Sequence, residues 1–229
     1  MKYLLIPLIL ISTGCATTIH PQCGLPGSET LTSIVRIATD DGSNASGVVV
    51  DQDRVLTVAH AVGDGSTAMV KYREKSYKAD VIATDTKTDL ALLAVETGDL
   101  EPVRLSTTQL KVFEQVWAVG FPLALEQKMT LGLFQNDHEG RLYTSTHINS
   151  GSSGGGLIRC RGGIYELAGV VHGYVAYRDG DNYVNIGDST SVPAKQILAF
   201  MDGAARRPSE NREPNAGKPI LAKFSDHFR

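Results

Sequence analysis

The chain has 229 residues, of which 42% are hydrophobic and 21% are charged, and its formal net charge at pH 7 is −3. This balance is typical of a globular protein with a substantial hydrophobic core, and it excludes a disordered or low-complexity chain. The 22 basic and 25 acidic residues nearly cancel, so the sequence offers no overall field for a polyanion and no nucleic-acid partner is expected.

The first predicted element is a secretory signal over residues 1–14. Lys2 supplies a positive start, an apolar run follows, and small residues lead to Cys15. The apolar run of roughly nine residues is too short to span a bilayer core about 30 Å thick, so a cleaved signal is expected. The ending Ser-Thr-Gly-Cys at residues 12–15 resembles the lipobox of bacterial lipoproteins, which implies a lipidated Cys15 at the mature N-terminus. An ordinary signal peptide with an incidental cysteine is the alternative.

The lipoprotein resemblance also implies a location. Acyl chains on Cys15 would anchor the protein to a membrane. Ala16 follows Cys15, whereas an aspartate there is the usual signal for retention in the inner membrane. We therefore expect a place in the bacterial cell envelope, at the periplasmic face of the outer membrane.

An N-terminal arm over residues 15–32 follows the signal. If Cys15 carries lipid, Cys23 and Cys160 remain as an even pair of cysteines in an oxidising compartment. We predict a disulfide that joins Cys23 to Cys160, and two independent buried thiols are the alternative.

The body of the chain is a series of short predicted strands. Apolar runs and period-two alternation, separated by turn residues, indicate β-structure rather than alternating strands and helices. The first set, in a unit over residues 33–100, comprises 33–39, 46–51, 54–58, 67–72, 77–84 and 90–95. The second set, in a unit over residues 101–201, comprises 112–120, 129–136, 142–147, 156–159, 164–171 and 183–186. The fold class is therefore all-β, with two consecutive six-stranded units.

A helix and a polar tail are predicted after the strands. Pro193 suits a first helical turn, and Ile197, Leu198 and Met201 share one face, which predicts a helix over 193–201. Residues 202–229 are polar, rich in proline and without periodicity, so we expect a disordered tail. A charged face that docks a partner is the alternative for this segment.

Three stretches of the sequence carry candidate chemistry. His60 directly follows an apolar strand, Asp89 begins another, and Ser153 lies in a glycine-rich loop over residues 149–156. Taken singly, each fits a structural role, namely a packed histidine, a strand cap and a flexible turn. Taken together, they supply the groups of serine catalysis. A serine hydroxyl needs an adjacent base, and the base needs a carboxylate that selects its tautomer.

These motifs resemble those of the trypsin-like (chymotrypsin-fold) serine proteases over about residues 33–201. Thr-Val-Ala-His ending at His60, Asp-Leu-Ala-Leu-Leu starting at Asp89, and Gly-Ser-Ser-Gly-Gly around Ser153 match the family's three motifs in order and spacing. The most similar subgroup is the short bacterial enzymes related to the high-temperature-requirement proteases. The resemblance implies two antiparallel six-stranded β-barrels with a C-terminal helix and a site between the barrels.

The same resemblance implies a serine endopeptidase that acts on protein or peptide substrates and needs no cofactor. Ser153 would attack the scissile carbonyl, His60 would transfer the proton, and Asp89 would orient His60. The N–H groups of Gly151 and Ser153 would form the oxyanion hole. Because His60 must be neutral to accept a proton, activity is expected to fall below about pH 6 to 7.

The expected substrate pocket departs from the family pattern. His147 lies six residues before Ser153, His172 stands where a small serine is common, and Gly173 follows in the strand beside the substrate backbone. A histidine in the pocket wall is a feature in which this sequence resembles the glutamate-specific endopeptidases. A preference for acidic substrate residues is therefore a hypothesis. Ser152 stands where zymogen-activated members carry an aspartate, so activation by a newly cut N-terminus is not expected.

Two other functions fit parts of the pattern. Residues 151–155 also match the nucleophile elbow of α/β-hydrolase esterases, but that fold requires the order Ser, acid, His and alternating strands and helices. A catalytically silent, protease-like binding module is the non-enzyme alternative. No metal site is expected from the sequence, because the six histidines form no HExxH motif and no close Cys/His pairing.

Overall fold

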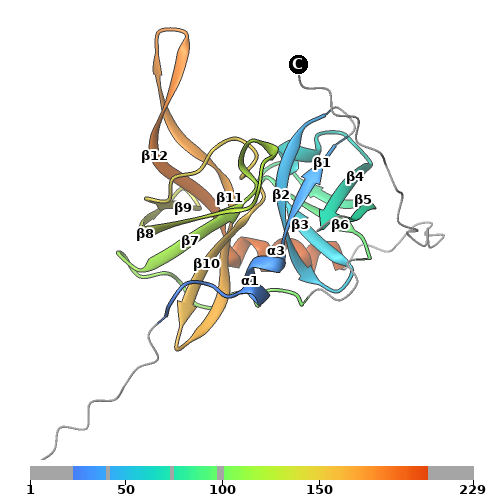
Figure 1. The fold of residues 1–229 in the computed structure, drawn as a ribbon, viewed down its shortest axis with the longest axis horizontal. Coiled ribbons are helices and arrows are strands. Elements are labelled where there is room, and N and C mark those ends of the chain that lie inside the picture. Colours follow the sequence, from blue (N-terminus) through green and yellow to red (C-terminus); the bar gives the residue numbers. More distant parts are fainter. Residues whose placement is uncertain (1–22, 40–41, 73–74, 97–100, 206–229) are drawn as a thin grey trace, which may run out of the picture.

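The computed structural model describes residues 23–39, 42–72, 75–96 and 101–205. The expected signal peptide, the expected lipidation site Cys15, and the residues from 206 onward lie outside the described residues. Within the described ranges, strands dominate and form two bodies (Figure 1).

The first body is a closed barrel in which every pair of neighbouring strands is antiparallel. Its strand order is β1-β2-β3-β6-β5-β4. The strands are β1 (Ile34–Ala38), β2 (Asn44–Asp51), β3 (Arg54–Thr57), β4 (Thr67–Tyr72), β5 (Lys75–Asp85) and β6 (Leu90–Ala94). Branched aliphatic side chains such as Val35, Ile37 and Val55 fill its interior, as expected for strands with one buried face.

The second body repeats this architecture. Its strands form a closed antiparallel barrel in the order β10-β11-β12-β9-β8-β7. The strands are β7 (Gln115–Gly120), β8 (Lys128–His138), β9 (Arg141–Thr144), β10 (Gly156–Arg161), β11 (Ile164–Asp179) and β12 (Asn182–Pro193). Phe134, Leu142 and Leu157 lie in its core. The predicted all-β double barrel is confirmed.

Several elements differ from the predicted ones. Two short helices, α1 (Ser28–Thr32) and α2 (Ala59–Val62), and the 3-10 turn η1 (Pro122–Ala124) were not predicted, because they are too short for a helical period to show. The C-terminal helix α3 (Ala194–Ala205) continues into the segment expected to be tail. Strands β11 and β12 are longer than expected and project from the second barrel as a hairpin (Figure 1).

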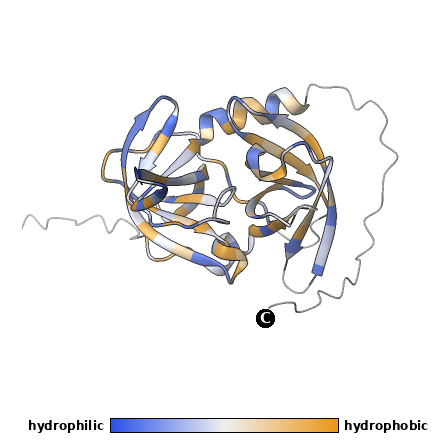
Figure 2. Ribbon diagram, turned by 90° about the horizontal axis from the view of Figure 1, so that it is seen from above, coloured by the Kyte–Doolittle hydropathy of each residue, from blue (hydrophilic) through white to orange (hydrophobic). Residues whose placement is uncertain are grey.

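One apolar cluster joins the two barrels. Ile34 and Leu56 of the first barrel pack in the same buried cluster as Trp117 and Ile158 of the second, together with Ile197 of α3. Figure 2 shows the barrels side by side, with hydrophobic residues along the strands of both. Full burial of one large aliphatic side chain contributes about 1.5–3 kcal/mol, so this shared cluster sets how the barrels sit against each other.

The structure contains the predicted disulfide between Cys23 and Cys160, with an S–S distance of 2.01 Å. It ties the segment before α1 to β10 across a sequence separation of 137 residues. In the chain-entropy model, closing a loop of this length lowers the entropy of the unfolded chain and so stabilises the folded state by about 5 kcal/mol. In the part of the chain that the structure describes, none of the helices has the length and apolar character needed to cross a membrane.

Candidate active site

Strand pairing brings His60 and Asp89 together. Strands β3 and β6 are antiparallel, with Thr57 opposite Ala91, so the end of β3 lies beside the start of β6. His60 follows β3 in helix α2, and Asp89 immediately precedes β6. The Nδ1 atom of His60 lies 2.7 Å from Oδ2 of Asp89, and the backbone N–H of His60 donates to Oδ1 at 2.9 Å. The two expected residues therefore form a bidentate contact.

Hydrogen bonds from both barrels hold the segment that carries Asp89. Asp89 has a φ of 61°, in the left-handed region where a residue other than glycine is strained by about 1–3 kcal/mol. Its carbonyl accepts the N–H of Ala59 at 3.2 Å. Arg141 of β9 donates to the neighbouring carbonyl of Thr88 at 2.9 Å. These bonds keep the carboxylate in place despite the strained backbone.

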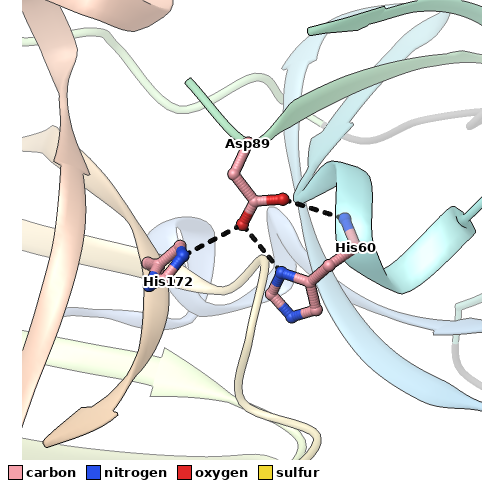
Figure 3. Close-up of side chains that lie close together, drawn as sticks. All are labelled: His60, Asp89 and His172. Atoms are coloured by element: carbon pink, nitrogen blue, oxygen red, sulfur yellow. Dashed lines mark hydrogen bonds and ion pairs between the residues drawn. The ribbon is translucent and has the colours of Figure 1, made fainter. Parts of the chain in front are cut away.

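A second histidine contacts the same carboxylate (Figure 3). The Nε2 atom of His172, on β11, lies 3.2 Å from Oδ2 of Asp89. Its Nδ1 lies 3.3 Å from Oγ1 of Thr190 on β12. The rings of His60 and His172 meet edge to face, with their centroids 5.7 Å apart. His172 was expected in the pocket wall, and in the structure its imidazole contacts Asp89. This contact joins residues on different barrels, which no local sequence pattern indicates.

Asp89 is an anion at neutral pH. Burial raises the pKa of its carboxyl, but hydrogen bonds from His172 and from the side chain and backbone of His60 outweigh burial and hold that pKa well below its usual value. An ionised carboxylate only accepts hydrogen bonds, so His60 must carry its proton on Nδ1 and His172 on Nε2. The lone pair of neutral His60 is then on Nε2, where a base needs it.

The loop that carries Ser153 is bonded to strands of both barrels. The carbonyl of Ser153 accepts the N–H of Ser46 on β2 at 2.8 Å. Gly154 donates to the carbonyl of Val171 on β11 at 2.7 Å, and Val171 donates back to Gly155 at 2.8 Å. The half-buried Ser153 is thereby placed beside β2 and β11, and β11 carries His172 in the next position.

Two glycines give this loop its shape. Gly154 has a φ of +85°, and a Cβ there would lie 2.1 Å from the carbonyl oxygen of Ser46 and 2.3 Å from Oγ1 of Thr57. Gly151 has a φ of +91°, and a Cβ there would lie 2.7 Å from the carbonyl oxygen of Phe121. Across the described ranges, neither Gly151 nor Ser153 donates its backbone N–H to a protein acceptor. Both amides are therefore available to a bound oxyanion.

A cavity of about 130 Å³ lies beside the loop. Of the three expected pocket residues, His147 is among its lining residues, together with Ile148, Asn149 and Ser152, whereas His172 and Gly173 are not. A larger groove of about 860 Å³, between the start of α3 and residues 106–110, is lined by none of His60, Asp89 and Ser153.

Comparison with known proteins agrees with this geometry. Residues 45–165 match the family model of the trypsin-like peptidase domain. The chain belongs to the trypsin-like peptidase family. It is 34% identical over 141 residues to a probable periplasmic serine endoprotease, DegP-like, of Pseudomonas fulva, a match that covers 56% of this chain and 28% of that protein. It is 28% identical over 195 residues to the mitochondrial serine protease HTRA2 of Drosophila ananassae, covering 78% of this chain and 43% of that protein.

The predicted relation to the high-temperature-requirement proteases is confirmed, although the matches span less than half the length of these relatives. A solved serine endoprotease from Yersinia pestis has the same fold, with a TM-score of 0.67 and 22% identity. That match covers 80% of this chain and 68% of the other chain.

In this trypsin-like peptidase, hydrogen bonds of the backbone hold the glycine-rich loop at Ser152, the residue before Ser153. Ser152 is buried and donates its N–H to the carbonyl of Asn149 at 3.0 Å, while its own carbonyl accepts the N–H of Gly155 at 3.0 Å. The hydroxyl of Ser46 donates to the carbonyl of Gly151 at 2.8 Å. The loop thus keeps its form without an acidic side chain at residue 152.

Proposed function

We propose that this chain is a serine endopeptidase that cleaves proteins or peptides through an acyl-enzyme intermediate. The observation that carries the proposal is the 2.7 Å contact between His60 Nδ1 and Asp89 Oδ2, which leaves the base lone pair on Nε2. The family match and the serine protease names of its relatives support the same function.

In the proposed reaction, Ser153 Oγ attacks the scissile carbonyl and its proton passes to His60 Nε2. Asp89 stays ionised, accepts a hydrogen bond from the Nδ1–H of His60, and stabilises the imidazolium. The N–H groups of Gly151 and Ser153 hold the oxyanion, and one such donor is worth about 2.7–4 kcal/mol. His60 then protonates the leaving amine, and a water molecule attacks the acyl-enzyme by the reverse sequence.

We assign the substrate backbone to β11 and the side-chain pocket to the region of His147. Among the described atoms outside its own neighbours, a Cβ at Gly173 would meet nothing within 4 Å, so this part of β11 leaves room for an extended peptide. His147 lines the cavity beside the Ser153 loop. An imidazole in that wall is suited to an acidic side chain of the substrate.

Labelling with a fluorophosphonate tests the nucleophile. We expect the wild-type chain to carry one label on Ser153, because the probe needs a serine activated by a neighbouring base. Ser153→Ala should lose the label, and Ser150→Ala, a matched change in the same loop, should keep it. Peptide mapping by mass spectrometry gives the labelled residue.

The outcomes separate the alternatives. A folded wild-type chain that takes no label would favour the silent binding module. A labelled chain that hydrolyses simple esters but no peptide or protein would favour the esterase. Labelling that persists in Ser153→Ala would remove Ser153 from the proposed role.

We further propose that the chain is a lipoprotein of the bacterial envelope, with signal 1–14, arm 15–32, a catalytic body of two units that begin at residues 33 and 101 and end with helix α3 at Ala205, and a tail after that helix. The lipobox-like residues before Cys15 and the following Ala16 support an anchor at the periplasmic face of the outer membrane. The Pseudomonas fulva relative is named as periplasmic.

Changing the acylated cysteine tests the anchor. Cys15→Ser expressed in a Gram-negative host should lose metabolic labelling by a clickable palmitate and leave the membrane fraction, because two or more acyl chains are needed for stable attachment. The double variant Cys23→Ser/Cys160→Ser, which removes the disulfide without leaving an unpaired thiol, serves as the cysteine control and should keep the label. A Cys15→Ser chain that keeps both label and membrane attachment would contradict the proposal.

A further inference from the structure

Three side chains that bind transition metals converge where the barrels meet (Figure 3). One ligand atom from each of His60, Asp89 and His172 lies within 4.8 Å of the other two. We propose that these residues form a binding site for a divalent transition metal ion, with Zn²⁺ as the best match, and that the bound ion reversibly inhibits the enzyme. The inhibition rests on the proposed function, whereas the binding does not.

The donor set and its spacing fit zinc. Two imidazole nitrogens and one carboxylate oxygen are common zinc ligands, at about 2.0–2.2 Å from the metal, so neighbouring ligand atoms of a tetrahedral site lie about 3.3 Å apart. Here His172 Nε2 and His60 Nδ1 lie 3.2 Å and 2.7 Å from Asp89 Oδ2. Admitting the ion requires the His60 Nδ1–Asp89 Oδ2 pair, now 2.7 Å apart, to open by about 0.6 Å, and the fourth position is left to water, as in zinc sites with three protein ligands.

The groups around the ligands also suit a metal site. Metal-binding histidines usually donate from the other ring nitrogen to a protein oxygen. Nδ1 of His172 lies 3.3 Å from Oγ1 of Thr190, and that hydroxyl donates to the carbonyl of Gly173 at 3.3 Å. Thr190 is therefore able to accept an N–H from His172 while its own hydrogen is bonded elsewhere. The second oxygen of Asp89 is held by the backbone N–H of His60.

The site has an entry path for an ion. The side chains of His60 and His172 are 51% and 37% exposed, while that of Asp89 is 12% exposed. The ion would meet the two imidazoles at the surface and an anionic carboxylate beneath them. A partly buried carboxylate attracts a divalent ion more strongly than a fully hydrated one does.

Metal binding at this site is incompatible with base catalysis. In the metal-free arrangement, His60 carries its proton on Nδ1 and His172 on Nε2. Coordination takes the lone pairs of these two atoms, so each proton moves through water to the other nitrogen of its own ring and none is lost. His60 Nε2 then carries a proton and is unable to accept one from Ser153, while His172 Nδ1 donates to Thr190. The ion thus selects the inactive tautomer of the base.

Zinc binding is tested first on the full chain with Ser153→Ala, which has all three ligands but lacks the proposed nucleophile. After removal of metal with a chelator, titration calorimetry with ZnCl₂ should give one ion per chain. Adding His172→Ser should weaken binding at least tenfold. His138→Ala, which removes an exposed histidine on β8 near Glu139, is the matched control and should leave the affinity unchanged.

Two further measurements distinguish the loss of a zinc ligand from a loss of folding in the His172 variants. His172→Asn is a second ligand variant, and circular dichroism checks that each variant keeps its β-structure. Co²⁺ in place of Zn²⁺ should give the visible spectrum of a tetrahedral ion, which His172→Asn should abolish. Zinc affinity that is equal with and without His172 in folded chains would overturn the proposed site.

Inhibition is measured on the chain with Ser153 intact. Zn²⁺ should stop peptide hydrolysis, and excess chelator should restore it. The zinc concentration that halves each chain's own uninhibited rate should be at least tenfold higher for His172→Ser than for the wild type. Binding without inhibition would overturn the regulatory half. A chain that hydrolyses no peptide even with chelator present would instead contradict the proposed function. The result of the zinc-binding experiment would remain valid in that case, because binding does not depend on activity.

Discussion

Ser153→Ala is expected to lower kcat for peptide hydrolysis by about a millionfold, the loss found when the nucleophile of a serine protease is removed. Without the hydroxyl, no acyl-enzyme forms, and His60 has no proton to accept. The amides of Gly151 and Ser153 remain, so a residual rate about 10³–10⁴ above that in water is expected from the oxyanion hole and binding alone. Single-turnover kinetics with a peptide library cut by the wild type provides the measurement.

The variant must be folded for this comparison to count. Ser153 is half-buried, and its carbonyl bond to Ser46 does not involve the side chain. The thermal midpoint of Ser153→Ala should therefore lie close to that of the wild type. A folded variant that keeps more than a tenth of the wild-type rate would show that another residue is the nucleophile.

Asp89→Asn is expected to lower kcat by about 10⁴-fold. The carboxylate oxygen lies 2.7 Å from His60 Nδ1 and can only accept a hydrogen bond. An amide at the same place can donate to Nδ1, which moves the proton of neutral His60 to Nε2 and removes the lone pair that faces the substrate. The profile of kcat/KM against pH should be measured for both forms, and a variant within tenfold of wild type at every pH would contradict the orienting role.

The same substitution should change how stability depends on pH. Burial raises the pKa of Asp89, but hydrogen bonds from His172 and His60 bring it well below the usual value. A carboxylate with a depressed pKa stabilises the fold fully above its unfolded pKa of about 3.9, and that contribution is lost as the pH falls through the folded-state pKa. Urea unfolding between about pH 5 and pH 2 should therefore show a shallower loss of free energy for Asp89→Asn than for the wild type.

Much of the fold follows from local patterns. The predicted strand at residues 67–72 coincides with β4, because alternate burial against the barrel core gives its sequence a period of two. The strands β11 and β12 of the projecting hairpin are longer than the predicted strands 164–171 and 183–186. Tyr177 and Val184 pair across it and are exposed, so no buried face marks the continuation of these strands in the sequence.

The candidate site divides in the same way. His60 and Asp89 were predicted together because each lies beside an apolar strand in a recognisable motif. The pairing of β3 with β6, seen in the structure, brings the two residues into contact. The role of His172 was not predicted. Its contact with Asp89 depends on the register of β11 and on the packing of one barrel against the other.

By itself, the sequence determined the strand content, the family and the residues of the proposed triad, since these depend on alternating burial and on short motifs within single segments. Only the tertiary structure decided that His60 and His172 share one carboxylate. That arrangement needs two barrels joined by a common apolar cluster, and such long-range packing is set by the sum of many contacts rather than by any local run of residues.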